Sequence, residues 1–399
     1  MQRSIIYLNN NDGSGTLAFG EGPVCCTSGN GALNKLQHFL EQHKGYYVFG
    51  FLSYDLKDDI HDLHSQNEDK LNFPDLYFWV PAHVVKLNNE HIEFVQGSKD
   101  PETLEFINSF LEEETDQNFH HYPFNFTPRI DRQTYISKVH GLQAHIQRGD
   151  IYEVNFCQEF YAENVELNYE LDSYFKLNQI TKAPFSAFVK LGDWVALCGS
   201  PERFLKKDGD RMISQPIKGT AARGKTETED LELKEKLRTD SKERSENIMI
   251  VDLVRNDLSQ IAEPSTVNVD ELCGIYTFET VHQMISTVSC TVREATTFSD
   301  LLRATFPMGS MTGAPKYRAM QLIEDFEDFK RGLFSGSIGY IAPNGDFDFN
   351  VVIRSMLYNR SNKYLSCAVG SAITAKSDAE YEYEECMVKI GRIINGMHE

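Results

Sequence analysis

Segments rich in β-branched and aromatic residues follow one another closely along this chain, and that arrangement restricts its fold more than any other feature. Beyond residue 150, strands are predicted at residues 151–161, 184–190, 194–206, 333–342, 347–358 and 363–370. Tight turns such as Asn344-Gly345-Asp346 separate neighbouring segments, and no regular alternation of strand and helix joins them. Strands joined by tight turns pair antiparallel, so the chain is predicted to have an α+β fold with antiparallel sheets.

The spacing of apolar residues predicts helices at 131–149, 168–179, 226–238, 241–255, 314–328 and 377–395. In the first hundred residues the clearest segments are strands, at 46–54 and 76–87. Residues 98–130 follow with a short helix and polar stretches such as EEETDQN, which mark a change in composition. We therefore place a boundary there, between an N-terminal region at 1–125 and a second domain at 126–399.

Composition and charge exclude several classes of protein. The chain carries 59 Asp and Glu against 39 Lys and Arg, so it lacks the basic footprint that nucleic acid requires. No stretch approaches roughly eighteen consecutive apolar residues, and the start of the chain is unlike a secretory signal, so we expect no membrane span. The eight cysteines are scattered without a CxxC pair, which indicates a reducing, cytoplasmic setting. The phosphate-binding patterns GxxxxGK[ST] and GxGxxG after a strand are both absent.

Two predicted helices each carry a pair of glutamates three residues apart. Glu243 and Glu246 form the first pair, and Glu382 and Glu385 form the second, with Lys389 following on the same side of its helix. Residues at that spacing share one helix face. Carboxylates from two helices suit a hard divalent cation such as magnesium, held partly by substrate oxygens. The same spacing is also typical of a solvated acidic face paired with nearby lysines and arginines, and spacing alone favours that interpretation.

The segment FPMGSMTGAPKYRAM and the strand NVVIRSM each contain an ambiguous polar residue. Ser310, Thr312 and Gly313 precede a helix with Pro315 in its first turn. The free backbone N–H groups of such a helix start attract anions, although an ordinary capped helix has the same pattern. Arg354 stands among apolar neighbours in a predicted strand, where it is either exposed or held for a carboxylate.

Lys218 lies in SQPIKGTAARG, where Gly219 and Thr220 allow a tight turn with free backbone N–H groups. The apolar residues before it could desolvate the amine, which would lower its pKa and make it nucleophilic. Most lysines beside a turn are simply solvated, so the pattern leaves both possibilities open. Glu202 in GSPERF is likewise either a salt-bridge partner or an acid.

Together these segments resemble the chorismate-utilising enzymes, which include anthranilate synthase large subunits and the isochorismate and salicylate synthases. The resemblance covers residues 126–399 as a chorismate-binding catalytic domain, and FGFLSYDLK (49–57) resembles the leading region of the same family. It rests on GDIYEVN (149–155), SPERF (200–204), PIKGTAARG (216–224), KERSENIMIVDLVRNDL (242–258), FPMGSMTGAPK (306–316), GSIGY (336–340), GDFDFNVVIRS (345–355) and EYEYEEC (380–386). It implies antiparallel sheets packed together and flanked by helices.

The resemblance assigns roles to the ambiguous residues. Glu246 and Glu385 match the family's direct Mg²⁺ ligands, while Glu243 and Glu382 act through water or on the substrate side. The metal clamps the ring carboxylate of chorismate and eases departure of the allylic hydroxyl. Further residues match substrate contacts: Arg354 and Gly370 for the enolpyruvyl carboxylate, Gly219 and Thr220 for the ring carboxylate, Ser310 as a hydroxyl contact, Phe334 as an aromatic wall, and Lys389 beside Glu385.

Two positions distinguish the activities within the family. Water-adding members carry a lysine general base where this chain has Glu153, so the resemblance disfavours isochorismate and salicylate synthesis. Anthranilate synthases usually read PIAGT where this chain reads PIKGT. The lysine form is typical of members that make 4-amino-4-deoxychorismate, the precursor of 4-aminobenzoate and folate. In those members the amine is thought to attack carbon 2 of chorismate while the hydroxyl leaves carbon 4, and ammonia then attacks carbon 4.

That reaction implies a catalytic group of Lys218, Glu202 and Glu243. Glu202 stands sixteen residues before Lys218, as the family's general acid does, and would protonate the departing hydroxyl. None of the eight cysteines lies in the GxCxG motif of a glutaminase, so we expect ammonia from a separate glutaminase subunit. A separate lyase would then release 4-aminobenzoate.

Some positions depart from the family pattern. A histidine is common where this chain has Gln283, although His282 stands one place earlier. Ser371 replaces a usual second glycine, and Glu153 replaces a common glutamine. Two alternatives therefore stay open, an anthranilate synthase component I and a catalytically silent chorismate-binding protein.

Overall fold

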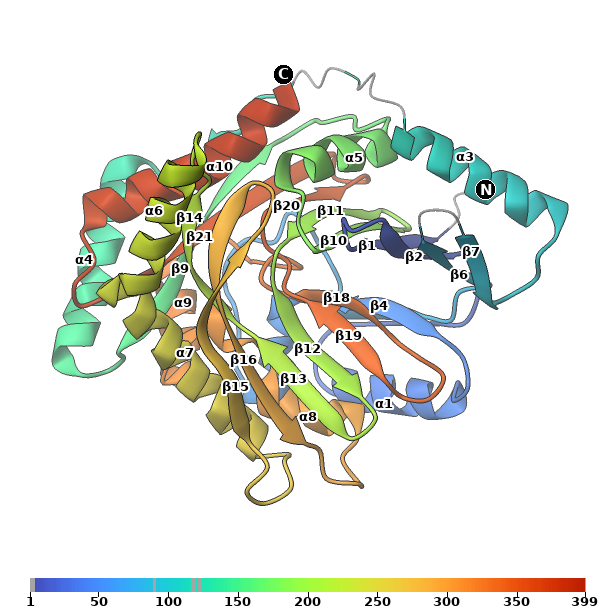
Figure 1. Cartoon of the computed structure of the whole chain (residues 1–399), viewed down its shortest axis with the longest axis horizontal. Helices are drawn as coiled ribbons and strands as arrows, with labels where there is room; N and C mark the ends of the chain where they lie inside the picture. Colours follow the sequence, from blue (N-terminus) through green and yellow to red (C-terminus); the bar gives the residue numbers. More distant parts are fainter. Residues whose placement is uncertain (1–3, 89–90, 116–119, 121–123, 399) are drawn as a thin grey trace.

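The computed structural model describes residues 4–88, 91–115, 120 and 124–398, and its strands assemble into two large sheets (Figure 1). Buried side chains of both sheets share one hydrophobic core. Sheet A runs in the order β17 (Gly313–Ala314), β9 (Glu153–Ala162), β21 (Tyr364–Thr374), β20 (Ser355–Asn359), β11 (Trp194–Ser200), β10 (Phe185–Leu191), β1 (Ile5–Asn9), β2 (Ser14–Phe19), β6 (His83–Asn88) and β7 (His91–Gln96), with β8 (Thr127–Pro128) paired to β9.

Sheet B runs in the order β14 (Ile217–Ala222), β16 (Val281–Thr291), β13 (Arg211–Gln215), β12 (Arg203–Asp208), β19 (Phe347–Asn350), β18 (Ser337–Ile341), β4 (Val48–Leu52), β5 (Leu76–Trp79) and β3 (Val24–Thr27), with β15 (Asn268–Thr277) also paired to β16. Every pairing between these strands is antiparallel. The predicted α+β fold with antiparallel sheets packed together is confirmed.

Helices cover the outer face of each sheet. Sheet A packs against α3 (Pro101–Thr115), α4 (Arg132–Arg148), α5 (Glu170–Thr181), α9 (Lys316–Phe326) and α10 (Ala379–His398). Sheet B packs against α1 (Ala32–Gln42), α6 (Glu227–Thr239), α7 (Ser241–Ser259) and α8 (Phe298–Thr305). The short helices η1 (Tyr54–Leu56), α2 (Lys57–His61) and η2 (Gly309–Met311) lie in connections. In the part of the chain that the structure describes, no helix combines the length and the apolar character that crossing a membrane requires.

The helices predicted from apolar spacing are all present, because their start and stop signals act locally. Asp131 caps α4 by accepting a hydrogen bond from the backbone N–H of Thr134, and the helix ends at Gly149, whose φ of 83° is in the left-handed region. Asp240 caps α7 in the same way, by accepting from the backbone N–H groups of Lys242 and Glu243. Local capping therefore fixes where the first glutamate pair begins.

The predicted boundary near residue 125 does not coincide with a break in either sheet. Residues 1–125 supply β1, β2, β6 and β7 to sheet A and β3, β4 and β5 to sheet B. The described parts of the two predicted regions are therefore joined through continuous backbone hydrogen bonding. The division stays a prediction.

Candidate active site

Two crossings between the sheets lie side by side and form the centre of the candidate site. The chain leaves sheet A after β11 and enters sheet B at β12, with Glu202 between them. It returns from β19 to β20 through residues 351–354, which end at Arg354. The Val351 backbone N–H donates to the Glu202 carbonyl at 3.0 Å, and the Gly199 N–H donates to the Arg354 carbonyl at 3.2 Å. The predictions of single strands at 194–206 and 347–358 are wrong, because each segment divides between the two sheets.

Glu202 is buried at its crossing and is 4% exposed. The Ser310 hydroxyl, in η2, donates a hydrogen bond of 2.7 Å to its carboxyl group. Burial raises the pKa of Glu202 to about 7, although the Ser310 hydrogen bond and the charges of Lys218 and Arg354 act in the opposite direction. A carboxyl group with such a pKa can hold a proton near neutral pH and then donate it, which is what a general acid needs.

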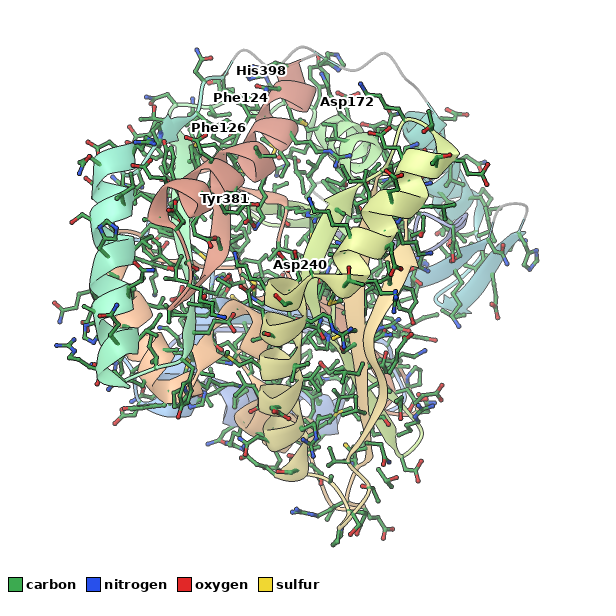
Figure 2. The ribbon with its side chains drawn as sticks, turned by 60° about the vertical axis from the view of Figure 1, so that its left-hand side comes forward. Phe124, Phe126, Asp172, Asp240, Tyr381 and His398 are labelled. Carbon is green, nitrogen blue, oxygen red and sulfur yellow. The ribbon has the colours of Figure 1, made fainter. Side chains whose placement is uncertain are left out.

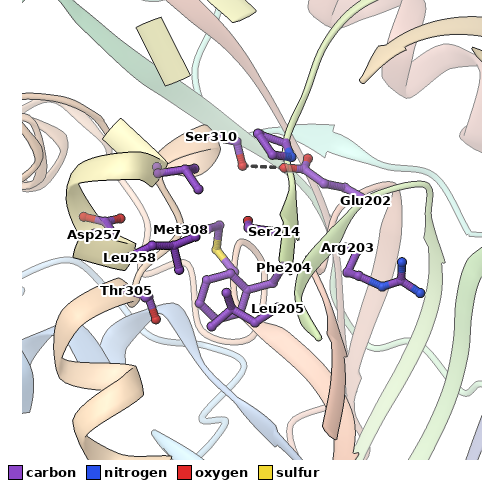
Figure 3. Close-up of a pocket in the computed structure, with 13 residues that line it drawn as sticks. Glu202, Arg203, Phe204, Leu205, Ser214, Asp257, Leu258, Thr305, Met308 and Ser310 are labelled. Atoms are coloured by element: carbon purple, nitrogen blue, oxygen red, sulfur yellow. Dashed lines mark hydrogen bonds between the residues drawn. The ribbon is translucent and has the colours of Figure 1, made fainter. Parts of the chain in front are cut away.

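The surroundings of Glu202 explain why its carboxyl group is desolvated. A cavity beside Glu202 and Ser310 is walled largely by apolar side chains, and their hydrogen bond lies at its edge (Figure 3). The apolar lining comes from Phe204, Leu205, Pro216, Val254, Leu258 and Met308. Little solvent therefore reaches the carboxyl group from this side.

Lys218, Gly219 and Thr220 lie in strand β14, so the predicted tight turn is wrong. The pairing of β14 with β16 shifts register between Ile217 and Thr220, which makes this segment a β-bulge. Gly219 has a φ of 95°, and a Cβ atom there would stand 3.1 Å from an oxygen of Glu243. Glycine is therefore required both by the backbone conformation and by the close approach of α7. Thr220 is exposed on the same strand.

The amine of Lys218 points to Glu153 in strand β9 of the other sheet. Its Nζ atom lies 3.0 Å from a Glu153 oxygen, with the two side chains 12% and 1% exposed. Burial alone would lower the pKa of Lys218, but the nearby carboxylates of Glu153, Glu246 and Glu202 outweigh it and raise the pKa. The predicted lowering of this pKa is therefore wrong for this structure, whose carboxylates favour the ammonium form of Lys218.

The glutamate pairs lie on α7 and α10, which approach each other at this site. Figure 2 shows Asp240 at the start of α7 and Tyr381 on α10, and the Lys242 ammonium lies 5.6 Å from the centre of the Tyr381 ring. Lys242 also lies 3.2 Å from Glu382 and 3.9 Å from Glu246. Glu246 of α7 and Glu382 of α10 thus come together around Lys242, which helical spacing alone does not predict.

Of these carboxylates, those of Glu246 and Glu382 are buried, and those of Glu243 and Glu385 are partly exposed. Burial raises the pKa of Glu246 to about 7, opposed by Lys218 and reinforced by Glu153 and Glu243. Burial also raises the pKa of Glu243. Burial would raise the pKa of Glu385 too, but Lys389, 2.6 Å from its carboxylate, reverses the direction and lowers it. The reading of a solvated acidic face does not apply to Glu246 and Glu382, which are both buried.

Whether these residues fit Mg²⁺ depends on the oxygens that they leave unpaired. Within the described ranges, no three His, Cys, Asp or Glu side chains converge closely enough to hold a metal ion by themselves. One buried oxygen of Glu246 has no hydrogen-bond partner among the described residues. This oxygen, which lies 3.9 Å from the Lys242 ammonium, and the nearby Glu243 carboxylate suit a cation that completes its shell with water and substrate oxygens. The residues therefore fit a magnesium ion held by few protein ligands.

Arg354 is largely desolvated but is paired with no carboxylate in the described part of the chain. Its φ is 52°, in the sparsely populated left-handed region, which is typical of functional sites. Burial and the charge of Arg392 lower its pKa to about 10, against the attraction of Glu202. A partly exposed guanidinium that has no carboxylate partner among the described residues suits recognition of a substrate carboxylate. The simple expectation of a solvent-exposed strand arginine is therefore wrong.

The remaining predicted contacts are distributed around this centre. Lys389 donates a hydrogen bond to the Gly370 carbonyl at 3.2 Å, which joins α10 to strand β21. A Cβ atom at Gly370 would lie 2.5 Å from the Cys157 sulfur, so no larger residue fits. Phe334 is buried in the core that both sheets share, just before β18. The contacts of these residues with a substrate stay predictions.

The residues that depart from the family pattern have different environments. His282 is fully buried and its ring nitrogens lie 2.9 Å from Asp230 and 3.0 Å from the Thr277 hydroxyl, so it is committed to structure near α6. Gln283 is the cross-strand neighbour of Thr220, is 1% exposed, and has no hydrogen-bond partner in the described ranges for either amide atom. The hydroxyl group of Ser371 lies 3.1 Å from that of Tyr135.

The sequence did not reveal two pairings that the site depends on. In the sequence Glu153 is only a departure from the family pattern, and its ion pair with Lys218 joins residues of different sheets. The signal for it is a charged residue in a segment predicted as a strand. Lys242 is not among the predicted site residues either, although it stands four residues before Glu246 and so shares its helix face.

Comparison with known proteins assigns the class. The model of the chorismate binding enzyme family matches residues 13–395, and the chain belongs to that family. It is 39% identical over 270 residues to aminodeoxychorismate synthase component 1 of Escherichia coli, a match that covers 68% of this chain and 59% of that one. It is 32% identical over 359 residues to anthranilate synthase component 1 of Thermus thermophilus, covering 88% of this chain and 77% of that one.

The crystal structure of anthranilate synthase component I from Streptococcus pneumoniae has the same fold. It superposes with a TM-score of 0.77 at 26% identity, covering 98% of this chain and 90% of that one. The aminodeoxychorismate synthases are matched over less of their length, since the alignment spans 59% of the Escherichia coli protein. The family and fold are thus shown across nearly the whole chain.

Proposed function

We propose that this protein is component I of an aminodeoxychorismate synthase, which converts chorismate and ammonia to 4-amino-4-deoxychorismate. The observation that carries the proposal is the placement of the Lys218 amine, 3.0 Å from Glu153, in a site whose other members include the acid Glu202. The similarity to the Escherichia coli enzyme supports the same activity. The product would lead to 4-aminobenzoate and folate.

The ion pair with Glu153 supplies the first step. A protonated amine has no free electron pair, so Lys218 must lose a proton before it can attack. The Glu153 carboxylate is the nearest acceptor, and its other oxygen is buried without a hydrogen-bond partner among the described residues. Proton transfer to Glu153 leaves a neutral amine beside a neutral acid. Glu153, noticed first as a departure from the family, thereby becomes the base that activates Lys218.

The substitution then proceeds in two balanced displacements. The Lys218 amine bonds to carbon 2 of chorismate, both ring double bonds shift by one position, and the hydroxyl leaves carbon 4 as water with a proton from Glu202. Ammonia next bonds to carbon 4, both double bonds shift back, and the bond between Lys218 and carbon 2 breaks. A proton returns to the amine from the attacking nitrogen. The first displacement uses the nucleophile Lys218 and the acid Glu202 of this chain, and the second uses ammonia.

The carboxylates and Arg354 would hold the substrate in position for these steps. Mg²⁺ bound by Glu246 and Glu385 would neutralise the ring carboxylate of chorismate, with Glu243 and Glu382 acting through water or on the substrate side. Arg354 would bind the enolpyruvyl carboxylate with a bidentate geometry. Gly219 and Thr220, beside α7, would receive the ring carboxylate with backbone N–H groups, and Ser310, Gly370, Phe334 and Lys389 would complete the site.

Ammonia and the later steps require partners. No cysteine of the chain lies in a GxCxG glutaminase motif, so we propose a separate glutaminase subunit, with free ammonium as a poorer source. A separate aminodeoxychorismate lyase would act on the product. All eight cysteines are free, which fits the cytoplasmic setting that we propose.

Anthranilate synthase component I is the second candidate function. The match to the Thermus thermophilus enzyme covers more of both chains than the match to the Escherichia coli aminodeoxychorismate synthase does, which favours this reading. The two activities differ in where nitrogen is added, and only the amination at carbon 4 gives Lys218 the role of nucleophile. A chorismate-binding protein without catalysis is the third candidate, based on Gln283 and Ser371.

The candidates are separated by one assay of the purified protein. It is incubated with chorismate, ammonium and magnesium, with and without an added aminodeoxychorismate lyase. The proposal predicts that chorismate is consumed and that 4-aminobenzoate forms only when the lyase is added. Fluorescent anthranilate without lyase would instead establish the second candidate. Chorismate that stays unconsumed, even with a glutaminase partner and glutamine, would establish the third.

A further inference from the structure

A fully buried arginine connects the separate segments that carry the catalytic side chains. Arg331 follows α9 and is 2% exposed. Its guanidinium donates to both oxygens of Glu327, at 2.9 and 2.6 Å. It also donates to the Met311 carbonyl at 2.8 Å, the Asn155 carbonyl at 2.9 Å and the Ser335 hydroxyl at 3.3 Å. One side chain therefore fixes the backbone of two segments far apart in the sequence, and a hydroxyl group in a third.

The first contact fixes the loop that presents Ser310. Met311 follows Ser310 in η2, and the Ser310 hydroxyl donates to Glu202 at 2.7 Å. Since η2 is only three residues long, few hydrogen bonds of its own hold it in place. The bond from Arg331 to the Met311 carbonyl therefore sets where the Ser310 hydroxyl meets the Glu202 carboxyl.

The second contact fixes the strand that presents Glu153. Asn155 lies two residues after Glu153 in β9, and Arg331 donates a hydrogen bond to its backbone carbonyl. The Asn155 backbone N–H also donates to the Thr312 carbonyl at 2.8 Å, which ties β9 to the segment after η2. Glu327 accepts a hydrogen bond from the Cys157 backbone N–H at 2.8 Å, so the partner of Arg331 holds the same strand.

Only an arginine satisfies this arrangement. Its planar guanidinium offers five donors in a fixed fork, whereas a lysine offers a single compact ammonium. The ring of Tyr54 lies 4.4 Å from the guanidinium carbon and covers one face. The Asp55 carboxylate accepts from the Gly332 backbone N–H at 2.8 Å and fixes the residue next to Arg331. The side chain is thus held on all sides and cannot shift to compensate for a change in one contact.

We propose that Arg331 is a positioning residue. It sets the distance between the proposed general acid Glu202, which is hydrogen-bonded to Ser310, and the proposed nucleophile Lys218, which is ion-paired with Glu153. The proposal rests on the proposed function, in which both pairs act on one substrate. Arg331 touches no reacting atom. It acts through the Met311 and Asn155 carbonyls, and its loss would move the acid relative to the nucleophile.

The test compares Arg331→Lys with Arg129→Lys. Arg129 forms a comparable ion pair with Glu159, further along the same strand, at 3.0 and 2.7 Å; its side chain is 17% exposed, and its hydrogen bonds reach none of residues 153–157 or 309–312. Because displacement of reacting groups by about 1 Å can cost a hundredfold, Arg331→Lys should lower kcat at least about tenfold. KM for chorismate should change much less than kcat, because Arg354, Gly219 and Gly370, which are proposed to bind its two carboxylates, accept no hydrogen bond from Arg331. The control should keep its kcat per folded molecule.

Amide hydrogen exchange gives a readout that does not depend on activity. Arg331→Lys should speed exchange at residues 309–312 and 153–157 at least about tenfold, and Arg129→Lys should not. If the wild-type protein consumes no chorismate, the proposed function fails, while exchange still decides the role of Arg331. If Arg331→Lys does not fold, the nearly isosteric Glu327→Gln should reproduce both effects in milder form. Unchanged kcat per folded molecule, or exchange no faster than in the control, would overturn the proposal.

Discussion

The pKa of Glu202 leads to a prediction in which its protonation is tested by protein stability and its role as an acid is tested by turnover. Burial raises this pKa from 4.5 to about 7, and an acid whose pKa is raised on folding stabilises the protein in its protonated form. The stabilisation is complete below the unfolded pKa and is lost as pH rises through the folded pKa. Glu202→Gln keeps the shape and neutrality of the protonated acid, so its stability should not contain this dependence.

The magnitude follows from the shift. A change of about 2.5 pKa units corresponds to about 3 kcal/mol, of which about 2–3 kcal/mol should develop between pH 5 and pH 8. Urea unfolding of both proteins at pH 5, 6, 7 and 8 measures it, since titration of other groups cancels in the difference. We expect the free energy of unfolding of Glu202→Gln, taken relative to that of the wild type, to rise by that amount as the pH increases from 5 to 8.

Turnover should change in the opposite direction to stability. An amide cannot donate the proton that the departing hydroxyl needs, so kcat of Glu202→Gln should fall by about 10²–10⁴-fold. KM for chorismate should change little, because the carboxylates of chorismate are bound elsewhere. A difference in unfolding free energy that stays constant from pH 5 to pH 8 would refute a protonated Glu202. Retained turnover would refute its role as acid.

The remaining predictions concern the nucleophile, the metal and the bulge. Lys218→Ala should lower turnover by about 10²-fold or more with chorismate affinity largely intact, measured by calorimetry beside steady-state kinetics; weakened binding with unchanged turnover would contradict it. Exhaustive chelation should abolish activity and added Mg²⁺ should restore it, whereas activity that survives chelation would rule out the carboxylate clamp by Glu246 and Glu385. Gly219→Ala should destabilise the protein by about 1–2 kcal/mol, because φ is 95° and the new Cβ meets Glu243; an unchanged melting temperature would show that the bulge relaxes.

The helices could be predicted because their signals are local. Asp131 and Asp240 cap α4 and α7 with their own side chains, and the glutamate pairs follow from helical spacing alone. Burial of those glutamates could not be predicted in the same way. It depends on α7 and α10 approaching each other across more than a hundred residues of sequence, which no local pattern encodes.

The crossings between sheets were harder to predict. Residues 194–206 and 347–358 have the composition of single long strands, yet each begins in one sheet and ends in the other. Strand propensity records that a segment is extended and half-buried, and it does not record which neighbour the segment pairs with. Glu202 and Arg354 lie at those crossings, so the sequence predicted both residues without showing why they meet.

Lys218 illustrates the limit for electrostatics. The apolar residues before it correctly indicated burial, and burial alone does lower a lysine pKa. The direction reverses because Glu153 approaches from the other sheet, and no pattern in the sequence indicates that its carboxylate lies next to Lys218. A local pattern can thus predict desolvation of a group but not the charges that fold next to it.

The most direct test of the account is the product that forms from chorismate and ¹⁵N-labelled ammonium in the presence of magnesium. We predict, by mass spectrometry, a product that keeps the enolpyruvyl group and carries one ¹⁵N at carbon 4, and that Lys218→Ala does not form it. Labelled anthranilate, which has lost the enolpyruvyl group, or a Lys218→Ala variant with wild-type yield would contradict amination through Lys218.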